Sequence, residues 1–297
     1  MGKIAFYLFF IITRIMTLLP LKGMFVISDI ARLFIYHIFR YRVKTVRTNL
    51  RNSFPEKSSK ELKRIEKAFY KHLCDLFIET IYILHANKKD FIKMCKFNNI
   101  ELFYDFYDKG KSVIVATGHY SNWELLGLFA YHNKHFTIGI YKPMKNKYFE
   151  KFLNSSRERF GAASVPMQDT LRAAIKCTNE KRLFFLGLVC DQTPSDIHYW
   201  TTFLNQDTPV FLGVEKISRK LNQPVIFCSM RKVARGRYEV ELETLCAEPL
   251  QTKPYEITEM HVHALEKLIY EAPEYWLWSH RRWKHRKPAD YKHEQTV

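Results

Sequence analysis

The sequence predicts an α/β protein with a mostly parallel central sheet flanked by helices, behind an apolar, helical N-terminal region. Short, continuous apolar runs separated by helix-length segments predict the sheet. An apolar N-terminal stretch followed by basic residues sets the beginning of the chain apart. The 297 residues, 47% of them hydrophobic, suffice for a substantial core. We therefore expect a membrane-associating helical region at 1–45 and one α/β domain at 46–297.

The N-terminal segment 4–21 is nearly all apolar and is about as long as a bilayer core requires, with Arg14 as its one charge. No small-residue cleavage site of a secretory signal follows it. Segment 25–41 has apolar residues at helical spacing and is followed by a basic tail, which favours the cytoplasmic side of a membrane. We predict a membrane anchor that spans the bilayer or lies in its interface; the alternative is an apolar hairpin packed on the protein's own core.

The remaining elements follow in order along the chain. Ser58 and Glu61 form the pattern of a capping box, which predicts a helix running to about Ala86. The apolar runs then predict buried strands, and the segments between them predict helices. The strands are expected at 112–117, 136–141, 183–190, 224–230 and 238–244, and two of the intervening helices at 123–132 and 147–160.

The net charge indicates which class of partner the protein binds, and the cysteine content indicates a reducing compartment. Lys and Arg outnumber Asp and Glu by 47 to 30, so the net charge of +17 favours a phospholipid surface, a nucleic acid or an acidic carrier protein. The six cysteines show no C-x-x-C pair, and no His cluster stands at zinc-ligand spacing. These cysteines are expected to be reduced and buried, and no metal site is predicted.

The segment 117–124 carries the most informative chemistry. His119 follows the strand predicted at 112–117, and ligand sites of open α/β sheets gather just past such strand ends. Gly118 permits a tight turn there, and Glu124 falls in the first turn of the next helix. A carboxylate that holds one ring nitrogen of His119 would let the other accept a proton from a substrate hydroxyl. The alternative reading is a capping box of Ser121 and Glu124, which requires no catalysis.

Five blocks together resemble the bacterial lipid A biosynthesis (late) acyltransferases, within the lysophospholipid and glycerolipid acyltransferase superfamily. They keep their order from about Arg40 to Lys287 and are specific as a set, with the H-x-x-x-x-E and HRRWK patterns as the strongest parts. The blocks are NLRNSFPE at 49–56, GHYSNWELLG at 118–127, RERFG at 157–161, DQTP at 191–194 and WLWSHRRWK at 276–284.

The resemblance implies transfer of a fatty acyl chain from acyl carrier protein, or from acyl-CoA, to a hydroxyl of a lipid A precursor. The reaction would take place at the cytoplasmic face of the bacterial inner membrane. His119 would be the general base and Glu124 its orienting partner. Neither a metal nor an organic cofactor is implied.

Further site residues are expected beside this pair. The family places basic residues at Arg157 and Arg159, where a guanidinium can bind a phosphate or an oxyanion, and Arg159 is the preferred candidate. A solvated helix face is the alternative. Asp191 ends the strand predicted at 183–190 and is expected to order the pocket, unless it only forms an Asx turn into Thr193. Asn122 and Gln192 are also predicted to bind substrate.

The C-terminal block surrounds Trp278 and Trp283 with basic residues, which suits an anionic membrane interface or lipid phosphates. Nucleic-acid binding could use the same residue types, but no RNP-like, zinc-finger or KH signature accompanies them, so no nucleic acid is expected. Two alternatives to lipid A acylation stay open. One is acylation of a lysophospholipid or aminolipid by the same chemistry, and the other is a non-enzymatic basic module that binds membrane or nucleic acid.

Overall fold

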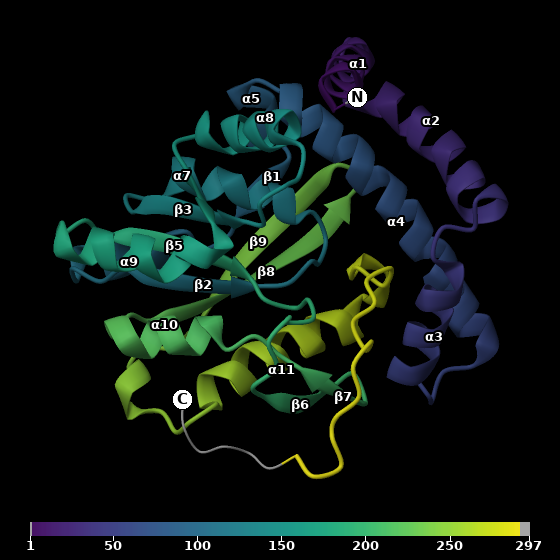
Figure 1. Cartoon of the computed structure of the whole chain (residues 1–297). Coiled ribbons are helices and arrows are strands. Elements are labelled where there is room, and N and C mark those ends of the chain that lie inside the picture. The colour runs from purple at the N-terminus through teal and green to yellow at the C-terminus, as the bar shows by residue number, and fades with distance from the viewer. Residues whose placement is uncertain (1, 292–297) are drawn as a thin grey trace.

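The computed structural model describes residues 2–291 and contains a seven-stranded sheet with helices on both faces (Figure 1). Every neighbouring pair in this sheet is parallel except the antiparallel β8–β9 pair. The predicted fold class, a mostly parallel sheet flanked by helices, is confirmed. In the spatial order of the sheet, the strands are β1 (Cys95–Phe97), β9 (Arg237–Cys246), β8 (Val225–Ala234), β2 (Val113–Thr117), β5 (Phe184–Val189), β3 (Phe136–Tyr141) and β4 (Ala163–Pro166), and a separate hairpin consists of β6 (Trp200–Phe203) and β7 (Gln206–Pro209).

The helices begin and end close to the predicted positions where their capping signals are strong. Ser58 caps α4 as predicted: its hydroxyl accepts a hydrogen bond from the Glu61 N–H at 3.3 Å, and the Glu61 carboxylate accepts one from the Ser58 N–H at 2.9 Å. The α-helices are α1 (Gly2–Met16), α2 (Leu21–Arg32), α3 (Val43–Ser53), α4 (Ser59–His85), α5 (Lys88–Ile92), α6 (Glu101–Asp108), α7 (Phe129–His132), α8 (Lys147–Glu158), α9 (Thr170–Asn179), α10 (Gly213–Leu221) and α11 (Glu256–Glu271). The π-helix η1 spans Leu33–Ile38, and the 3-10 helices are η2 (Trp123–Leu128), η3 (Met167–Asp169), η4 (Pro249–Gln251) and η5 (Pro273–Tyr275).

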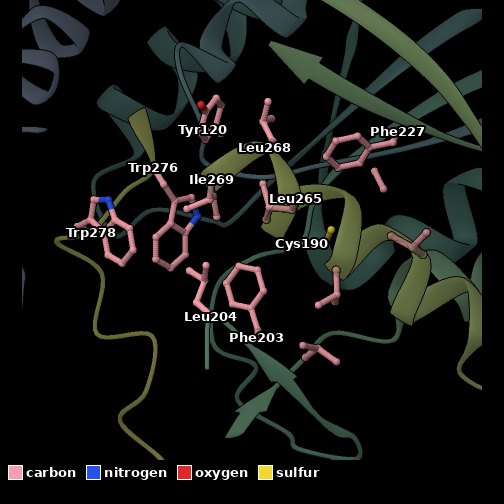
Figure 2. Close-up of a cluster of buried hydrophobic side chains, with 14 of the residues drawn as sticks. Tyr120, Cys190, Phe203, Leu204, Phe227, Leu265, Leu268, Ile269, Trp276 and Trp278 are labelled. Carbon is pink, nitrogen blue, oxygen red and sulfur yellow. The ribbon is translucent and has the colours of Figure 1, made fainter. Parts of the chain in front are cut away.

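Two apolar clusters sandwich the sheet, because successive side chains of a strand point to opposite faces. In β2, Ile114 and Ala116 join the cluster that includes residues of α9, α10 and α11, whereas Val113 and Val115 join the cluster with α5, α6 and α7. Figure 2 shows part of the first cluster, where Phe203 of β6 packs edge-on against Trp276 at a ring-centroid distance of 5.7 Å. The sheet is therefore covered on both faces, as its continuous apolar runs predict.

The predicted N-terminal segment is divided into separate helices that pack on the domain (Figure 1). Phe6 of α1 contacts the aromatic rings of α8, and Ser28 of α2 donates a hydrogen bond to Asp75 of α4 at 2.7 Å. Pro20 separates α1 from α2 and interrupts the apolar stretch. Within residues 2–291, no helix combines the length and apolarity needed to cross a bilayer, so the spanning form of the predicted anchor is not found there.

Much of this region's apolar surface faces solvent. Ile4 of α1 has 76% of its surface exposed, although α1 and α2 each contact a neighbouring helix. We call the exposed set the N-terminal apolar surface. It comprises Ile4, Tyr7, Leu8, Phe10, Ile11, Ile12, Ile15, Leu18, Leu19, Val26, Ile30, Leu33, Phe34, Ile38, Phe39 and Tyr41.

Several details differ from the predictions. The helix expected at 123–132 is a 3-10 helix, η2, followed by the single turn of α7. Strands β1 and β4 and the β6–β7 hairpin were not predicted. Each of these strands has only three or four residues, too few for apolar periodicity to identify. The six cysteines are free and buried, as expected.

Candidate active site

The candidate site lies where the neighbouring parallel strands β2 and β5 end. Thr117 and Val189, the last residues of the two strands, lie opposite each other in register. The pairing extends one residue beyond β5, since the Cys190 N–H donates to the Thr117 carbonyl at 3.1 Å. His119 and Asp191 therefore each stand two positions beyond paired residues, at the carboxyl edge of the sheet where α/β proteins bind their ligands.

His119 and Asp191 form a tight pair through two contacts. The His119 Nδ1 and Asp191 Oδ1 atoms are 2.6 Å apart, and the His119 backbone N–H donates to Oδ2 at 2.9 Å. The Nε1–H of Trp276 also donates to Oδ2, at 2.7 Å. The Asp191 side chain is only 3% exposed, compared with 18% for His119. The carboxylate thus lies in the interior, behind an imidazole that reaches the surface.

The charges of the pair stabilise each other. Burial opposes ionisation of Asp191, but the charge and hydrogen bonds of His119 and the hydrogen bond from Trp276 outweigh it and lower the Asp191 pKa to about 2. Burial likewise opposes protonation of His119, but Asp191 raises the His119 pKa above its ordinary value through charge and hydrogen bonding, and the charge of Glu124 adds to this effect. The site is therefore built to favour an imidazolium beside a carboxylate.

The other ring nitrogen of His119 faces a polar group. Nε2 lies 3.1 Å from the Gln192 Nε2. When Nδ1–H donates to Asp191, Nε2 is an acceptor and receives a hydrogen bond from the Gln192 amide. Trp123 packs edge-on against the imidazole, with the ring centroids 4.9 Å apart. The Nε2 lone pair is the atom that can accept a proton from a substrate hydroxyl.

Glu124 does not occupy the place expected for it. Its carboxylate is bound by Arg157 of α8, whose Nη2 lies 3.2 Å from Oε2 and 3.5 Å from Oε1. The prediction that Glu124 orients His119 is wrong: the carboxylate that contacts the imidazole is that of Asp191, which follows the adjacent strand β5. The capping box is also absent, because Asn122, not Ser121, is the N-cap of η2 and makes no side-chain capping bond.

Of the two predicted basic residues, Arg157 joins the site through Glu124, whereas Arg159 is anchored elsewhere. The Arg159 guanidinium donates to the Ile83 carbonyl near the end of α4 and lies over the Phe160 ring, 4.4 Å from its centroid. The two side chains thus reach different partners and only Arg157 contacts Glu124, while the prediction that Arg159 binds substrate stays a prediction.

Asn122 and Gly118 support the site from the interior. Asn122 is fully buried, and its amide donates to Glu79 of α4 at 2.7 Å, which does not fit the predicted contact with substrate. A Cβ on Gly118 would lie 2.7 Å from the Leu265 side chain and 3.2 Å from Asp191 Oδ2, so a larger residue would require these side chains to move. The left-handed backbone conformation belongs instead to Ser121, with φ of 56°.

The C-terminal block lies against the 119–122 loop. The Leu277 N–H donates to the His119 carbonyl at 3.2 Å, and the Ser121 N–H donates to the Tyr275 carbonyl at 2.9 Å. Arg282 and Trp278 are buried, which corrects the prediction that the whole block forms an anion-binding surface. Arg281 and Lys284 of the block are exposed, as are His285 and Arg286, which follow it.

The structure adds residues that were not predicted. Trp276 binds Asp191, and two polar side chains of α4, His72 and Glu79, contact the 119–122 loop. The sequence carries a signal for the α4 pair: both residues, like Asp75 between them, are polar side chains at buried positions of a long helix, where such groups are costly.

Comparison with protein-family models matches residues 2–285 to the family described as bacterial lipid A biosynthesis acyltransferase. A search of curated proteins found no match. The family match covers nearly the whole chain, including both strands that end at the His119–Asp191 pair and the helices of the N-terminal region. The chain therefore belongs to the bacterial lipid A biosynthesis acyltransferase family.

Proposed function

We propose that the protein transfers a fatty acyl chain from the thioester of acyl carrier protein, or of acyl-CoA, to a hydroxyl of a lipid A precursor, with His119 as general base. The observation that carries this proposal is the 2.6 Å contact between His119 Nδ1 and the buried Asp191 carboxylate, with Nε2 directed away from it. Such a pair activates an oxygen nucleophile that belongs to the substrate, so no nucleophilic side chain is required.

The proton movements follow from this geometry. Nε2 of His119 takes the proton of the acceptor hydroxyl as its oxygen attacks the thioester carbonyl, forming a C–O bond and a tetrahedral oxyanion. The oxyanion collapses, the C–S bond breaks, and the imidazolium returns the proton to the thiolate that leaves. Asp191 stabilises the imidazolium between the two steps. The hydrogen bond from the Gln192 amide to Nε2 must break before the acceptor hydroxyl can donate to that nitrogen.

Arg157 and Glu124 form the second part of the proposed site. The two side chains are 35% and 26% exposed, so the Arg157 guanidinium retains donors that a substrate phosphate or the oxyanion can use. Glu124 fixes this guanidinium and adds negative charge near His119. Its role in the H-x-x-x-x-E pattern is thus to place Arg157 and to stabilise the imidazolium through space.

The N-terminal apolar surface is proposed to lie in the interface of an anionic membrane, on the cytoplasmic side. Its apolar side chains extend over α1, α2 and η1, and exposed basic residues accompany them. An apolar helical face beside basic residues binds anionic lipid surfaces without crossing them. The acceptor lipid would then be delivered from the membrane to the domain.

Charged substitutions on this surface are expected to weaken membrane binding. Leu8 and Ile15 are each 59% exposed on α1, and burying an apolar side chain of this size stabilises by about 1.5–3 kcal/mol. The Leu8→Glu/Ile15→Glu double variant is expected to bind anionic phospholipid vesicles at least about tenfold more weakly in a flotation assay. Leu250→Glu, at a residue 60% exposed on η4, is the matched control. Equal binding by the double variant would contradict the proposal.

The reaction and the acceptor are tested together by lipid mass spectrometry. Cells that lack the gene are expected to accumulate a lipid A precursor with one acyl chain fewer, and the wild-type gene should restore the chain. An altered phospholipid or aminolipid profile instead would identify a different acceptor for the same chemistry. An unchanged lipid profile would argue against any role in lipid acylation.

A further inference from the structure

Helix α4 directs two buried polar side chains at the segment between His119 and Glu124. His72 is 4% exposed and Glu79 is fully buried. They stand seven positions apart, about two helical turns, so they lie on the same face of the helix. Neither residue belongs to the pair that would exchange protons with substrate.

The two side chains hold consecutive residues of the loop. His72 Nε2 lies 3.2 Å from the Ser121 carbonyl oxygen, and Glu79 Oε2 accepts hydrogen bonds from the Asn122 amide at 2.7 Å and from the Tyr238 hydroxyl at 2.5 Å. Burial, with a smaller contribution from Lys232, lowers the His72 pKa to about 3, so the ring is neutral and its Nε2–H can donate to the carbonyl.

The loop needs such support because its backbone is strained. Ser121 is completely buried and adopts a left-handed conformation with φ of 56°, which is unfavourable for a residue with a side chain. Its N–H is held by the Tyr275 carbonyl on one side, and its C=O is held by His72 on the other. This bend lies two positions after His119 and three before Glu124, so it sets the relative placement of the two residues.

Packing alone does not account for His72 and Glu79. In the described part of the chain, His72 Nδ1 and Glu79 Oε1 have no hydrogen-bond partner, and the nearest cation to Oε1, Lys232 Nζ, is 3.9 Å away. Burying such groups costs free energy, and apolar side chains of similar volume would fill the same space more favourably. Their hydrogen bonds to the Ser121 carbonyl and the Asn122 amide explain why these polar side chains are buried despite that cost.

Helix α4 is itself fixed to the sheet near these contacts. Asp75 lies one turn before Glu79 and is bound by Lys232 of β8 at 3.2 Å and by Arg235 of the β8–β9 turn. Arg235 also binds Asp29 of α2. These ion pairs fix α4 relative to the sheet. His72 and Glu79 therefore contact the loop from a fixed position relative to His119, which follows a strand of the same sheet.

We propose that His72 and Glu79 are positioning residues of the transfer reaction, which hold Ser121 and Asn122 so that His119 meets Asp191 and Glu124 meets Arg157. This inference rests on the proposed function. It assigns to α4 a role in the site that is separate from its contacts with α2.

The test compares these residues with matched buried residues that lie away from the loop. His72→Leu is paired with His135→Leu, because His135 is also 4% exposed and contacts the Lys111 carbonyl at 2.9 Å, near the opposite ends of the strands. Glu79→Leu is paired with Glu66→Leu, because Glu66 is 3% exposed on the same helix and binds Tyr36 at 2.7 Å. For each variant, kcat and KM for acyl transfer, the thermal midpoint and the His119 pKa by NMR are measured.

All four Leu variants are expected to have lower thermal midpoints, but only His72→Leu and Glu79→Leu should lower kcat, by about 10- to 100-fold with little change in KM, because misplacement by about 1 Å can cost about 100-fold. Their His119 pKa should fall toward its ordinary value as the contact with Asp191 loosens. Glu79→Gln, which keeps an acceptor for Asn122, should recover most of the rate. Rates equal to those of the two control variants would overturn the proposal.

If the Leu variants do not fold, Asn122→Ala cuts the same contact from the loop side. It should lower kcat as Glu79→Leu would, and combining it with Glu79→Gln should add no further loss, since Asn122→Ala has already removed the contact through which residue 79 acts on the loop. A kcat of Asn122→Ala equal to wild type would overturn the proposal. His119→Ala in the same assay separates the two hypotheses: wild-type transfer by that variant would refute the general-base mechanism, whatever the loop variants do.

Discussion

The His119→Ala variant is expected to lower kcat for acyl transfer by at least about a hundredfold, the contribution typical of a positioned general base. The attacking hydroxyl is a weak nucleophile while it keeps its proton, and Nε2 is the ring nitrogen that is not engaged by Asp191 and can accept that proton. Because alanine removes the base and leaves the Arg157–Glu124 pair intact, the KM values for both substrates should change much less than kcat.

This result is measured with purified protein, an acylated carrier protein and a lipid acceptor, following product formation in the steady state. His198→Ala is the control: the His198 side chain is 55% exposed and forms its own pair with an aspartate, Asp196. The control should transfer at the wild-type rate. Wild-type transfer by His119→Ala would refute the assignment of the base, and loss of activity in the control would point to a general effect of removing an imidazole.

The sequence was sufficient for the parts of the fold that depend on local signals. Helix α4 starts at the capping box of Ser58 and ends beside Ala86, as predicted, and its capping signal lies within its own first turn. Strands β2 and β3 also lie where continuous apolar runs place them. The N-terminal segment was less predictable, since its apolar length favours a span while Pro20 divides it into shorter helices.

The site was predictable as a set of residues but not as a set of contacts. The sequence predicts His119, Asp191 and Gln192 as site residues and the structure brings them into contact, yet the partner of His119 depends on β2 and β5 being neighbours, which sequence order does not reveal. Glu124 seemed the closer carboxylate because only five positions separate it from His119. In the structure its carboxylate binds Arg157, and the backbone between it and His119 includes the left-handed turn at Ser121.

The residues that hold the 119–122 loop and Asp191 in place could not be predicted from motifs. His72 and Glu79 precede the H-x-x-x-x-E block by 47 and 40 positions, and Trp276 follows it by 152. Their contacts with Ser121, Asn122 and Asp191 arise from tertiary packing of α4 and the C-terminal segment. Such contacts follow from the fold, so they become visible only when the fold is known.

The Asp191→Asn variant is expected to lose about 10²- to 10⁴-fold in kcat, comparable to the effect of the same change in a Ser-His-Asp triad. An Asn amide can donate to Nδ1, which favours the tautomer that carries its proton on Nε2 and blocks that atom as a base. The amide is neutral, so it also lacks the negative charge with which the Asp191 carboxylate stabilises the imidazolium. Glu124→Gln provides the comparison: its effect should be smaller, because Glu124 binds Arg157 and affects His119 only through space.

The pH dependence of the wild-type enzyme and of Asp191→Asn distinguishes these roles. A general base must be unprotonated, so kcat/KM of the wild type should rise with pH through an apparent pKa above 6.5, because the folded-state pKa of His119 is raised. In Asp191→Asn the carboxylate charge is gone while burial remains, so this apparent pKa should shift to lower pH and the plateau should fall. A profile unchanged in Asp191→Asn but shifted in Glu124→Gln would mean that Glu124, not Asp191, controls the ionisation of His119 during transfer.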